Sequence, residues 1–216
     1  MFLNKDIQMI IWPVGLLQCN CVILYDANTV SMVDPGGDPE RLVYFCQSRH
    51  LILDSILITH AHIDHIMGIY ALKKHYPNVK IYLQKHDDFL YKNIEMQAEF
   101  LGWPEVVKQP DYSHTLEHGM LVDMGCANCK VIHTPGHTPG SVCFYAEMPE
   151  GPLLLSGDTL FDGSIGRTDL WGGNYEQILD SIQNRLMILD NKTRVIPGHG
   201  SETTIKKERT SNPFLL

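Results

Sequence analysis

Stretches of β-branched, aromatic and aliphatic residues alternate with turn residues along the first half of the chain. Their lengths, and the Gly, Pro, Asn and Asp residues between them, predict strands at 7–12, 22–25, 29–33, 53–59 and 79–83. Apolar residues at intervals of three and four predict helices at 39–48, 64–76 and about 86–101. Pro39 suits the first turn of the first helix, and Pro77 ends the second.

The second half of the chain has the same alternation without repeating the sequence. Strands are predicted at 130–134, 141–145, 153–156 and 194–196, and a helix at 174–189. Two β-rich halves, each accompanied by helices, favour an α+β fold in which two sheets pack face to face under helical layers. On pattern alone, an α/β arrangement stays open.

Composition narrows the class of protein. The 216 residues are 44% hydrophobic and 19% charged, which suits one sizeable core and a single domain over residues 1–216. The net charge of −8 repels phosphate backbones, so we expect no nucleic-acid partner. The apolar N-terminal stretch lacks the basic start and cleavage site of a signal peptide, and no apolar run reaches a membrane span. We therefore expect a cytoplasmic protein without a membrane partner.

The six cysteines have irregular spacing, which argues against a disulfide framework. Cys126 and Cys129 form a CxxC pair that could bind a metal or carry out redox chemistry. A structural zinc ribbon needs a second such pair, and the sequence has none. The simpler interpretation is that both are small residues in a turn before a strand.

The segment THAHIDH concentrates His60, His62, Asp64 and His65 directly after a predicted strand. An extended backbone points His60 and His62 to the same side. Asp64 could instead cap the following helix, but capping would not explain three histidines. Because clustered imidazoles repel one another when protonated, a shared metal ion is the simplest explanation.

Three later segments also place a metal-type residue beside glycine at the end of a predicted strand. They are HTPGHTPGS with His137, SGDT with Asp158 and PGHG with His199. Glycine and proline allow tight turns and a close approach of the backbone to an ion. Each segment alone is a weak signal, whereas together with THAHIDH they form a strong one.

These motifs resemble the metallo-β-lactamase superfamily, and THAHIDH matches its HxHxDH signature. Within the superfamily the chain looks most like glyoxalase II, the hydroxyacylglutathione hydrolases, in their short bacterial form. The similar text is HTPGHTPGSV, SGDTLFDGSIGRTDLWGGN and IPGHGSETTIKKERTSNPFL. The resemblance implies a four-layer αβ/βα sandwich of two mixed sheets flanked by helices. It also implies a single domain without the C-terminal helical extension of longer glyoxalase II enzymes.

The resemblance further implies a binuclear site for two divalent metal ions, zinc above all, with iron or manganese as alternatives. By position, one ion would be held by His60, His62 and His137, and the other by Asp64, His65 and His199. Asp158 would bridge the two ions. A hydroxide shared by the ions would attack the carbonyl of a small-molecule thioester such as S-lactoylglutathione. Asp64 and Asp158 are then the catalytic carboxylates, with Asp64 as ligand and orienting group.

Other residues have two open interpretations. Arg167 resembles a substrate-binding cation of the family, or it pairs with Asp162 or Asp169 to hold its loop. Asp169 could instead orient a metal-bound histidine, and Asp34 and Thr59 would support the ligand loops. The aromatics Phe100, Trp103 and Tyr112 could form a lid over the site or belong to the local core. The remaining histidines are expected on the surface or as caps: His50, His75, His86, His114, His118 and His133.

The sequence departs from longer glyoxalase II enzymes in ways that leave the thiol half of the substrate open. An aromatic residue that follows the Gly-Lys/Arg pair in those enzymes is replaced here by Thr168 and Asp169. A related alternative is a persulfide dioxygenase that holds one iron through His60, His62 or His137, and Asp158. Hydrolysis of β-lactams is disfavoured because the position of Asp158 is often cysteine in that branch. A non-catalytic binding module is disfavoured because all seven ligands are present, and we expect a monomer or small homo-oligomer.

Overall fold

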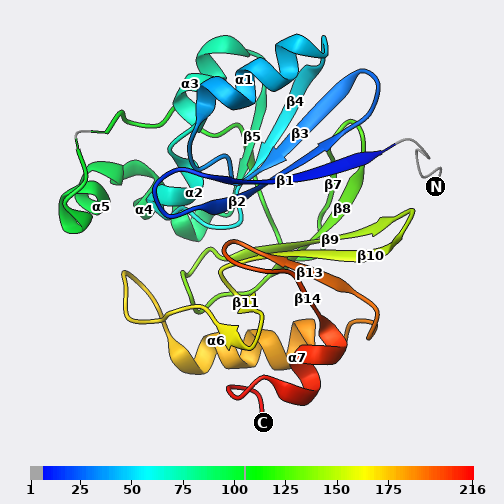
Figure 1. Cartoon of the computed structure of the whole chain (residues 1–216). Coiled ribbons are helices and arrows are strands. Elements are labelled where there is room, and N and C mark those ends of the chain that lie inside the picture. The colour runs from blue at the N-terminus through cyan, green and yellow to red at the C-terminus, as the bar shows by residue number, and fades with distance from the viewer. Residues whose placement is uncertain (1–6, 105) are drawn as a thin grey trace.

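Two six-stranded mixed sheets pack face to face in the computed structural model, which describes residues 7–104 and 106–216 (Figure 1). Helices cover the outer face of each sheet, so the order of layers is helix, sheet, sheet, helix. This confirms the predicted α+β fold. Within the described ranges, no helix is long and apolar enough to cross a membrane.

The first sheet has the strand order β1-β2-β3-β4-β5-β6. Its antiparallel part is β1 (Gln8–Val14), β2 (Cys19–Tyr25) and β3 (Thr29–Val33). Its parallel part continues from β3 through β4 (Ile52–Leu57), β5 (Lys80–Leu83) and β6 (His114–Thr115). The helices of this half are α1 (Pro39–Ser48), α2 (Ile63–Ile66), α3 (Ile69–His75), the 3₁₀-helix η1 (Lys85–Asp87), α4 (Asp88–Lys92) and α5 (Ile94–Leu101).

The second sheet has the strand order β14-β13-β10-β9-β8-β7. Its strands are β7 (Leu121–Asp123), β8 (Asn128–His133), β9 (Val142–Met148), β10 (Gly151–Gly157), β13 (Arg194–Pro197) and β14 (Thr203–Thr204). Only β10 and β13 pair in parallel. A small hairpin of β11 (Leu160–Phe161) and β12 (Ser164–Ile165) follows β10, and the outer layer holds α6 (Tyr175–Ser181), the π-helix η2 (Ile182–Leu186) and α7 (Ile205–Ser211).

Strand β2 shows why the two sheets form the inner layers of the fold, between the helices. Every second side chain of its apolar run faces the helical layer, and Cys21 and Ile23 pack there. The alternate residues Val22 and Leu24 face the second sheet. A strand buried on both faces needs apolar residues at every position, whereas a strand with one wet face would alternate.

The predicted helix at 64–76 is interrupted, because it divides into α2 and α3 around Gly68. The backbone N–H of Gly68 donates to the carbonyl of Pro35 at 2.9 Å, and a Cβ there would lie only 2.4 Å from that oxygen. The chain must therefore pass close to the loop after β3 and cannot continue one straight helix. Tyr70 and His75 are exposed, and the buried residues of α3 are Ile69 and Leu72.

Other boundaries differ in the same manner. The predicted helix at about 86–101 consists of η1, α4 and α5, and the one at 174–189 ends as the π-helix η2. The sequence did not predict α7, whose exposed face is strongly polar, although the Thr204 side chain accepts from the N–H of Lys207 as an N-cap. The two-residue strands β6, β11, β12 and β14 are too short for any pattern to indicate them.

Gly36 lets the loop after β3 lie directly against Asp64 and His65 of α2, two of the candidate metal ligands. A Cβ at this position would lie 1.5 Å from the carbonyl oxygen of Asp64 and 3.1 Å from the Cα of His65. We expect Gly36→Ala to lower the free energy of unfolding by about 1–3 kcal/mol, because the backbone must move apart to admit the methyl group. Urea unfolding followed by circular dichroism measures the loss.

Gly102→Ala is the comparison variant, since Gly102 has a φ of +65° and nothing within 4 Å of its Cβ direction. That variant should lose only about 1 kcal/mol, through backbone conformation alone. If Gly36→Ala were as stable as the unaltered chain, the close approach would not constrain the loop.

Candidate metal centre

Three histidine rings meet where the two sheets join. His60 and His62 follow β4, and His137 lies in the loop between β8 and β9. The Nε2 atom of His137 lies 3.1 Å from His60 Nε2 and 2.8 Å from His62 Nδ1. All three side chains are buried, and their nitrogens are close enough to share one ion.

Two carboxylates and two further histidines lie beside this group. Asp64 Oδ2 is 3.0 Å from His199 Nε2 and 3.6 Å from His65 Nε2. Asp158, directly after β10, has its Oδ1 atom 3.5 Å from His65 Nε2. Its Oδ2 atom lies 3.7 Å from His137 Nε2 and 3.8 Å from His199 Nε2. Asp158 therefore lies between the two groups of histidines.

Asp64 does not cap α2, contrary to the alternative that its position had left open. His62 is the N-cap residue, and its side chain makes no capping hydrogen bond. Asp64 stands in the first turn, with its carboxylate directed to His199 and His65. All seven residues expected from the sequence as metal ligands are thus brought together.

Hydrogen bonds on the outer side fix four of the five imidazole rings, because each Nδ1 faces a protein oxygen. The pairs are His60 with Thr59 Oγ1 at 3.1 Å, His65 with Asp34 Oδ2 at 2.9 Å, His137 with the Arg167 carbonyl at 2.7 Å, and His199 with the Leu17 carbonyl at 3.1 Å. Carbonyls and carboxylates only accept, so in the last three pairs Nδ1 carries the hydrogen. The opposite nitrogen, Nε2, is then turned inward as a potential ligand.

The hydrogen-bond chain behind His60 has a defined direction. The Thr59 hydroxyl donates to Asp34 Oδ2 at 2.6 Å, which leaves the hydroxyl oxygen to accept from His60 Nδ1. The Thr59 N–H also donates to Asp34 Oδ1 at 2.8 Å. Asp34 and Thr59 therefore support the ligand loop, as expected from their positions next to ligand-bearing strand ends.

The electrostatics favour the metal-binding forms of His60, His62 and Asp64, and the protonated form of His199. Burial, together with the positive charge of neighbouring histidines, lowers the pKa of His60 and His62, so both are neutral. Burial opposes ionisation of Asp64, yet His65 and the hydrogen bond from His199 hold the pKa of this carboxyl below its usual range. Burial likewise opposes charge on His199, but its hydrogen bond to Asp64 raises the pKa. Neutral imidazole and ionised carboxylate are the ligand forms.

The residues fit metal ions on structural grounds. His62 Nε2, His65 Nε2 and Asp158 Oδ1 are buried without a hydrogen-bond partner in the described part of the chain. Leaving such atoms unpaired costs free energy, and inward lone pairs repel one another. Cations among them would remove both penalties, and imidazole with carboxylate suits zinc, iron or manganese.

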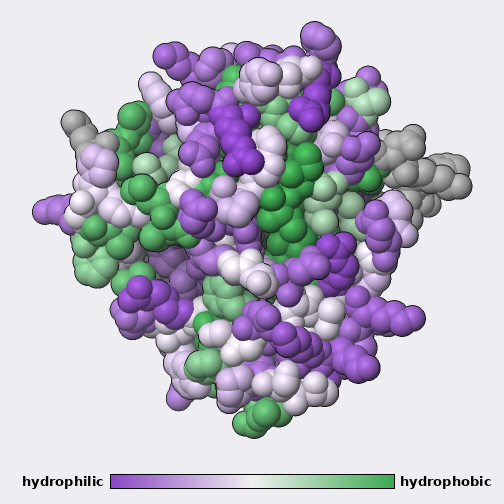
Figure 2. All heavy atoms as spheres, in the orientation of Figure 1, coloured by the Kyte–Doolittle hydropathy of each residue, from purple (hydrophilic) through white to green (hydrophobic). Residues whose placement is uncertain are grey.

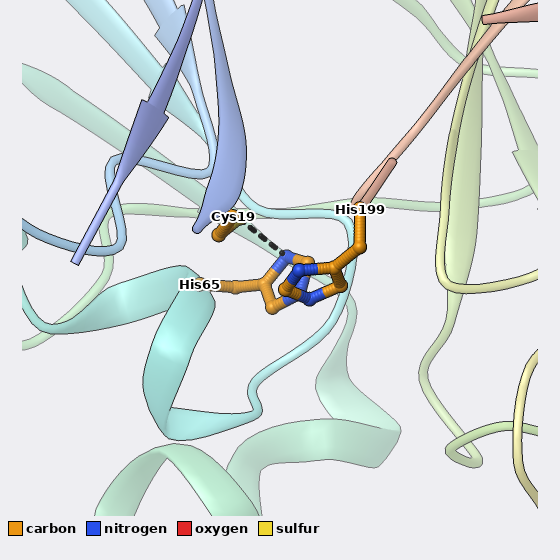
Figure 3. A group of neighbouring side chains, drawn as sticks. All are labelled: Cys19, His65 and His199. Atoms are coloured by element: carbon orange, nitrogen blue, oxygen red, sulfur yellow. Dashed lines mark hydrogen bonds between the residues drawn. The ribbon is translucent and has the colours of Figure 1, made fainter. Parts of the chain in front are cut away.

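Cys19 is a neighbour of the centre that the sequence did not indicate. Its Sγ atom lies 3.5 Å from His65 Nδ1, and His199 approaches the same ring from another side (Figure 3). Burial raises the pKa of the Cys19 thiol to about 12, so the sulfur remains protonated. Because His65 Nδ1 also contacts Asp34, Cys19 packs against the outer side of the ring, away from Asp158.

Asp87 is a second residue that the sequence did not indicate, and it connects the two loops that carry the histidine trio. Its carboxylate accepts from the Ala61 N–H at 2.9 Å, the Thr138 hydroxyl at 2.8 Å and the Gly140 N–H at 2.6 Å. Burial raises the pKa of Asp87, and these three donors oppose the rise. Ala61 lies between His60 and His62, so one carboxylate fixes both loops.

A cavity of about 280 Å³ opens beside the centre. Arg167 lies on its wall, and the guanidinium pairs with Asp169 through two contacts of 2.8 Å. Asp162 pairs with Lys207 instead. The loop-holding interpretation of Arg167 is therefore observed, and a substrate contact stays a prediction. Asp169 does not orient His137, whose Nδ1 hydrogen is accepted by the Arg167 carbonyl.

Of the two interpretations of the aromatic residues, local core and lid, the first holds for Trp103 and Tyr112. Trp103 and Tyr112 pack against the core between the first sheet and its helices. Phe100 is 62% exposed and contacts Trp171, with ring centroids 5.0 Å apart. Trp171 in turn lies 6.2 Å from the His62 ring. The segment SIGRTDLWGGN had been singled out for its motif, but Trp171 had not been recognised in it as a cavity residue.

The simpler interpretation of the CxxC pair, two small residues in a turn before a strand, is correct for Cys126 but not for Cys129. All six cysteines are free and buried. Cys126 precedes β8 and donates to the Leu24 carbonyl at 3.3 Å, and Cys129 lies within β8. Among the residues described, the clusters close enough to share an ion do not include this pair.

Comparisons with known proteins show what this chain is similar to in sequence and fold. A sequence model described as the metallo-beta-lactamase superfamily matches residues 14–199. The chain is 38% identical to the hydroxyacylglutathione hydrolase GloC of Haemophilus influenzae, over 94% of this chain and 95% of that protein.

Two solved structures are similar over almost the whole chain. The BLEG-1 B3 metallo-beta-lactamase superposes with a TM-score of 0.87 at 36% identity, covering 96% of this chain and 99% of the other. TTHA1623 in a di-iron-bound form superposes with a TM-score of 0.86 at 38% identity, covering 95% of this chain and 100% of the other. The similarity therefore extends over nearly the whole fold.

Metal loading tests the centre directly. We expect two divalent ions per chain and a higher unfolding temperature when they are bound, since ions at 100 times their Kd stabilise a fold by about 2.7 kcal/mol. Elemental analysis and thermal unfolding with and without a chelator measure both quantities. Cys129→Ala should bind the same number of ions. Unfolding that is insensitive to chelator, with less than one ion per chain, would contradict the assignment.

Asp87→Asn tests the support of the histidine trio. The amide keeps the size of the side chain but can accept from fewer N–H groups, so the trio should hold its ion about 10–100-fold more weakly. Competition with a coloured chelator measures the two affinities separately, and the site of Asp64, His65 and His199 should change less. Asp88→Asn, the same replacement at the next residue, a half-buried carboxylate that pairs with Lys92 and contacts neither histidine loop by any hydrogen bond in the described residues, is the control. Equal loss from both variants would show that Asp87 has no particular role.

Proposed function

Because this chain belongs to the metallo-beta-lactamase superfamily of metallo-hydrolases, we propose that it is a metal-dependent enzyme that hydrolyses thioesters. The observation that carries the proposal is the position of Asp158. One of its carboxylate oxygens faces His65, and the other faces His137 and His199. A carboxylate placed between two ligand groups suits two ions that act together on one bond.

The proposed ligands form two sets. His60, His62 and His137 would hold one ion, and Asp64, His65 and His199 the other, with Asp158 shared between them. When bound, the ions would bring the pKa of water close to 7 and place positive charge beside the carbonyl oxygen of the substrate. Zinc is our first choice, and the di-iron form of TTHA1623 keeps iron open.

The side chains of the protein would orient the reactants. Asp64, held ionised and 3.0 Å from His199, can accept a hydrogen bond from an attacking water and so fix its direction. The arrangement needs no separate acid for the leaving group, because a thiol ionises at a pKa of about 8.5. This is why we favour a thioester over an amide among carbonyl substrates.

The name of the relative from Haemophilus influenzae supports this class, since a hydroxyacylglutathione is a thioester. The single-iron dioxygenase alternative would leave Asp64, His65 and His199 without a ligand role, although the Asp64 carboxylate lies 3.0 Å from His199 and 3.6 Å from His65. The B3 metallo-beta-lactamase relative makes β-lactam cleavage the second reaction to measure.

The test is hydrolysis of S-D-lactoylglutathione by the metal-loaded protein, followed through loss of the thioester absorbance. We expect turnover that a chelator abolishes. His62→Ala should reduce kcat/KM at least about 100-fold, because even residues that only support metal ligands cost 10–100-fold when removed. His75→Ala, which changes an exposed histidine at the end of α3, should leave turnover unaltered.

Parallel assays separate the alternatives. Oxygen consumption with glutathione persulfide and no thioester cleavage would show that the protein is a persulfide dioxygenase instead. Rapid opening of a chromogenic cephalosporin without thioester cleavage would indicate a β-lactamase. Turnover that His62→Ala leaves unchanged would exclude the metal mechanism.

A further inference from the structure

One wall of the cavity beside the centre is apolar. Leu17, Leu101, Leu170 and Trp171 line it. They come from three separate parts of the chain: the turn between β1 and β2, the end of α5, and the loop before α6. Because Trp171 lies 6.2 Å from the ring of His62, the wall begins at the candidate metal ligands themselves.

This wall continues into exposed apolar surface. Phe100 is 62% exposed and extends the wall by its edge contact with Trp171. Leu17 is 49% and Leu101 is 38% exposed. Figure 2 shows hydrophobic side chains gathered over α5. Apolar groups that converge from different elements on a cavity mouth indicate a binding surface, whereas isolated exposed apolar residues do not.

The polar side chains of the same wall already have partners. Gln97 accepts from the N–H of Ile63 at 2.9 Å and donates to the carbonyls of Ala61 and Leu90, each at 3.0 Å. Arg167 is the only lysine or arginine among the described residues that line the cavity.

The charge of Arg167 is compensated by Asp169 through two contacts of 2.8 Å. A carboxylate on the substrate would have to compete with Asp169 for that guanidinium. The wall therefore offers apolar area and little that would bind a charged peptide thiol such as glutathione.

We propose that the preferred substrates are uncharged thioesters with an extended aliphatic or aromatic substituent, which packs against Trp171, Phe100 and Leu101. This rests on the thioester hydrolysis proposed above and names its substrate class. Transfer of apolar groups from water to such a wall is favourable in proportion to the area covered. Remote contacts of this kind lower KM before they change kcat.

Two series of thioesters test the proposal with the metal-loaded protein. One series lengthens the acyl group from acetyl to hexanoyl on N-acetylcysteamine, and the other lengthens the thiol from ethanethiol to hexanethiol with acetyl fixed. In at least one series kcat/KM should rise by up to about fourfold per methylene, mainly through KM. The best member should exceed S-D-lactoylglutathione. Flat or falling profiles in both series would overturn the proposal.

Variants connect the preference to the wall. Phe100→Ala and Trp171→Ala should each flatten the rise with chain length, and Trp171→Phe should keep most of it. Tyr44→Ala removes an aromatic side chain of α1 that is 71% exposed and serves as the matched control, with an unaltered profile. A rise that persists in both alanine variants would contradict the assignment of these residues.

Binding of an unreactive thioether separates this proposal from the proposed reaction. S-hexyl-N-acetylcysteamine should bind the metal-loaded protein up to about 250-fold more tightly than the S-ethyl analogue, as measured by calorimetry, and Trp171→Ala should remove most of that difference. Length-dependent binding without cleavage of any thioester would support the apolar wall and refute the reaction. Cleavage with equal binding of both thioethers would support the reaction and refute the wall.

Discussion

Two buried carboxylates hold the loop on which the centre depends. Asp34 accepts from both the N–H and the hydroxyl of Thr59, and from His65 Nδ1. Asp87 accepts from the N–H of Ala61 two residues further along. Burying a carboxylate costs several kcal/mol unless its oxygens are filled by donors. Here Thr59 and Ala61 of the loop supply donors to both carboxylates, so a change in the conformation of the loop would leave carboxylate oxygens buried without donors.

These hydrogen bonds fix the orientation of the histidine rings as well as their position. A ring whose Nδ1 hydrogen is accepted by a protein oxygen can present only Nε2 to the interior. Four rings are held in this way by partners from four different segments of the chain. The close approach of their inner nitrogens is therefore imposed by hydrogen bonds behind them, and cations would relieve it.

Reaction chemistry and substrate preference come from different parts of the fold. The candidate ligands follow buried strands of both sheets, where the backbone is held by ladder hydrogen bonds. The apolar wall comes from a turn, a helix end and a loop, which can vary without disturbing the sheets. Such a division lets one fold act on many substrates, so substrate specificity depends on the apolar wall and not on the candidate metal ligands.

Patterns along the chain were sufficient for the layers but not for the boundaries. The run 21–25 within β2 is apolar at every position because both faces of the strand are buried, and this is visible without coordinates. The break at Gly68 was not visible, because its cause is the carbonyl of Pro35, which is distant in sequence. The polar outer face of α7 likewise concealed a helix whose inner residues Ile205 and Glu208 are buried.

The sequence by itself determined the set of candidate ligands, since His60, His62, Asp64 and His65 share one turn and glycine-flanked motifs mark the rest. Only the tertiary structure decided what surrounds them. Nothing in the sequence had singled out Asp87, which the fold places against Gly140, 53 positions away. Local chemistry can be recognised in a short motif, whereas support and specificity arise from contacts between distant segments, which no local pattern records.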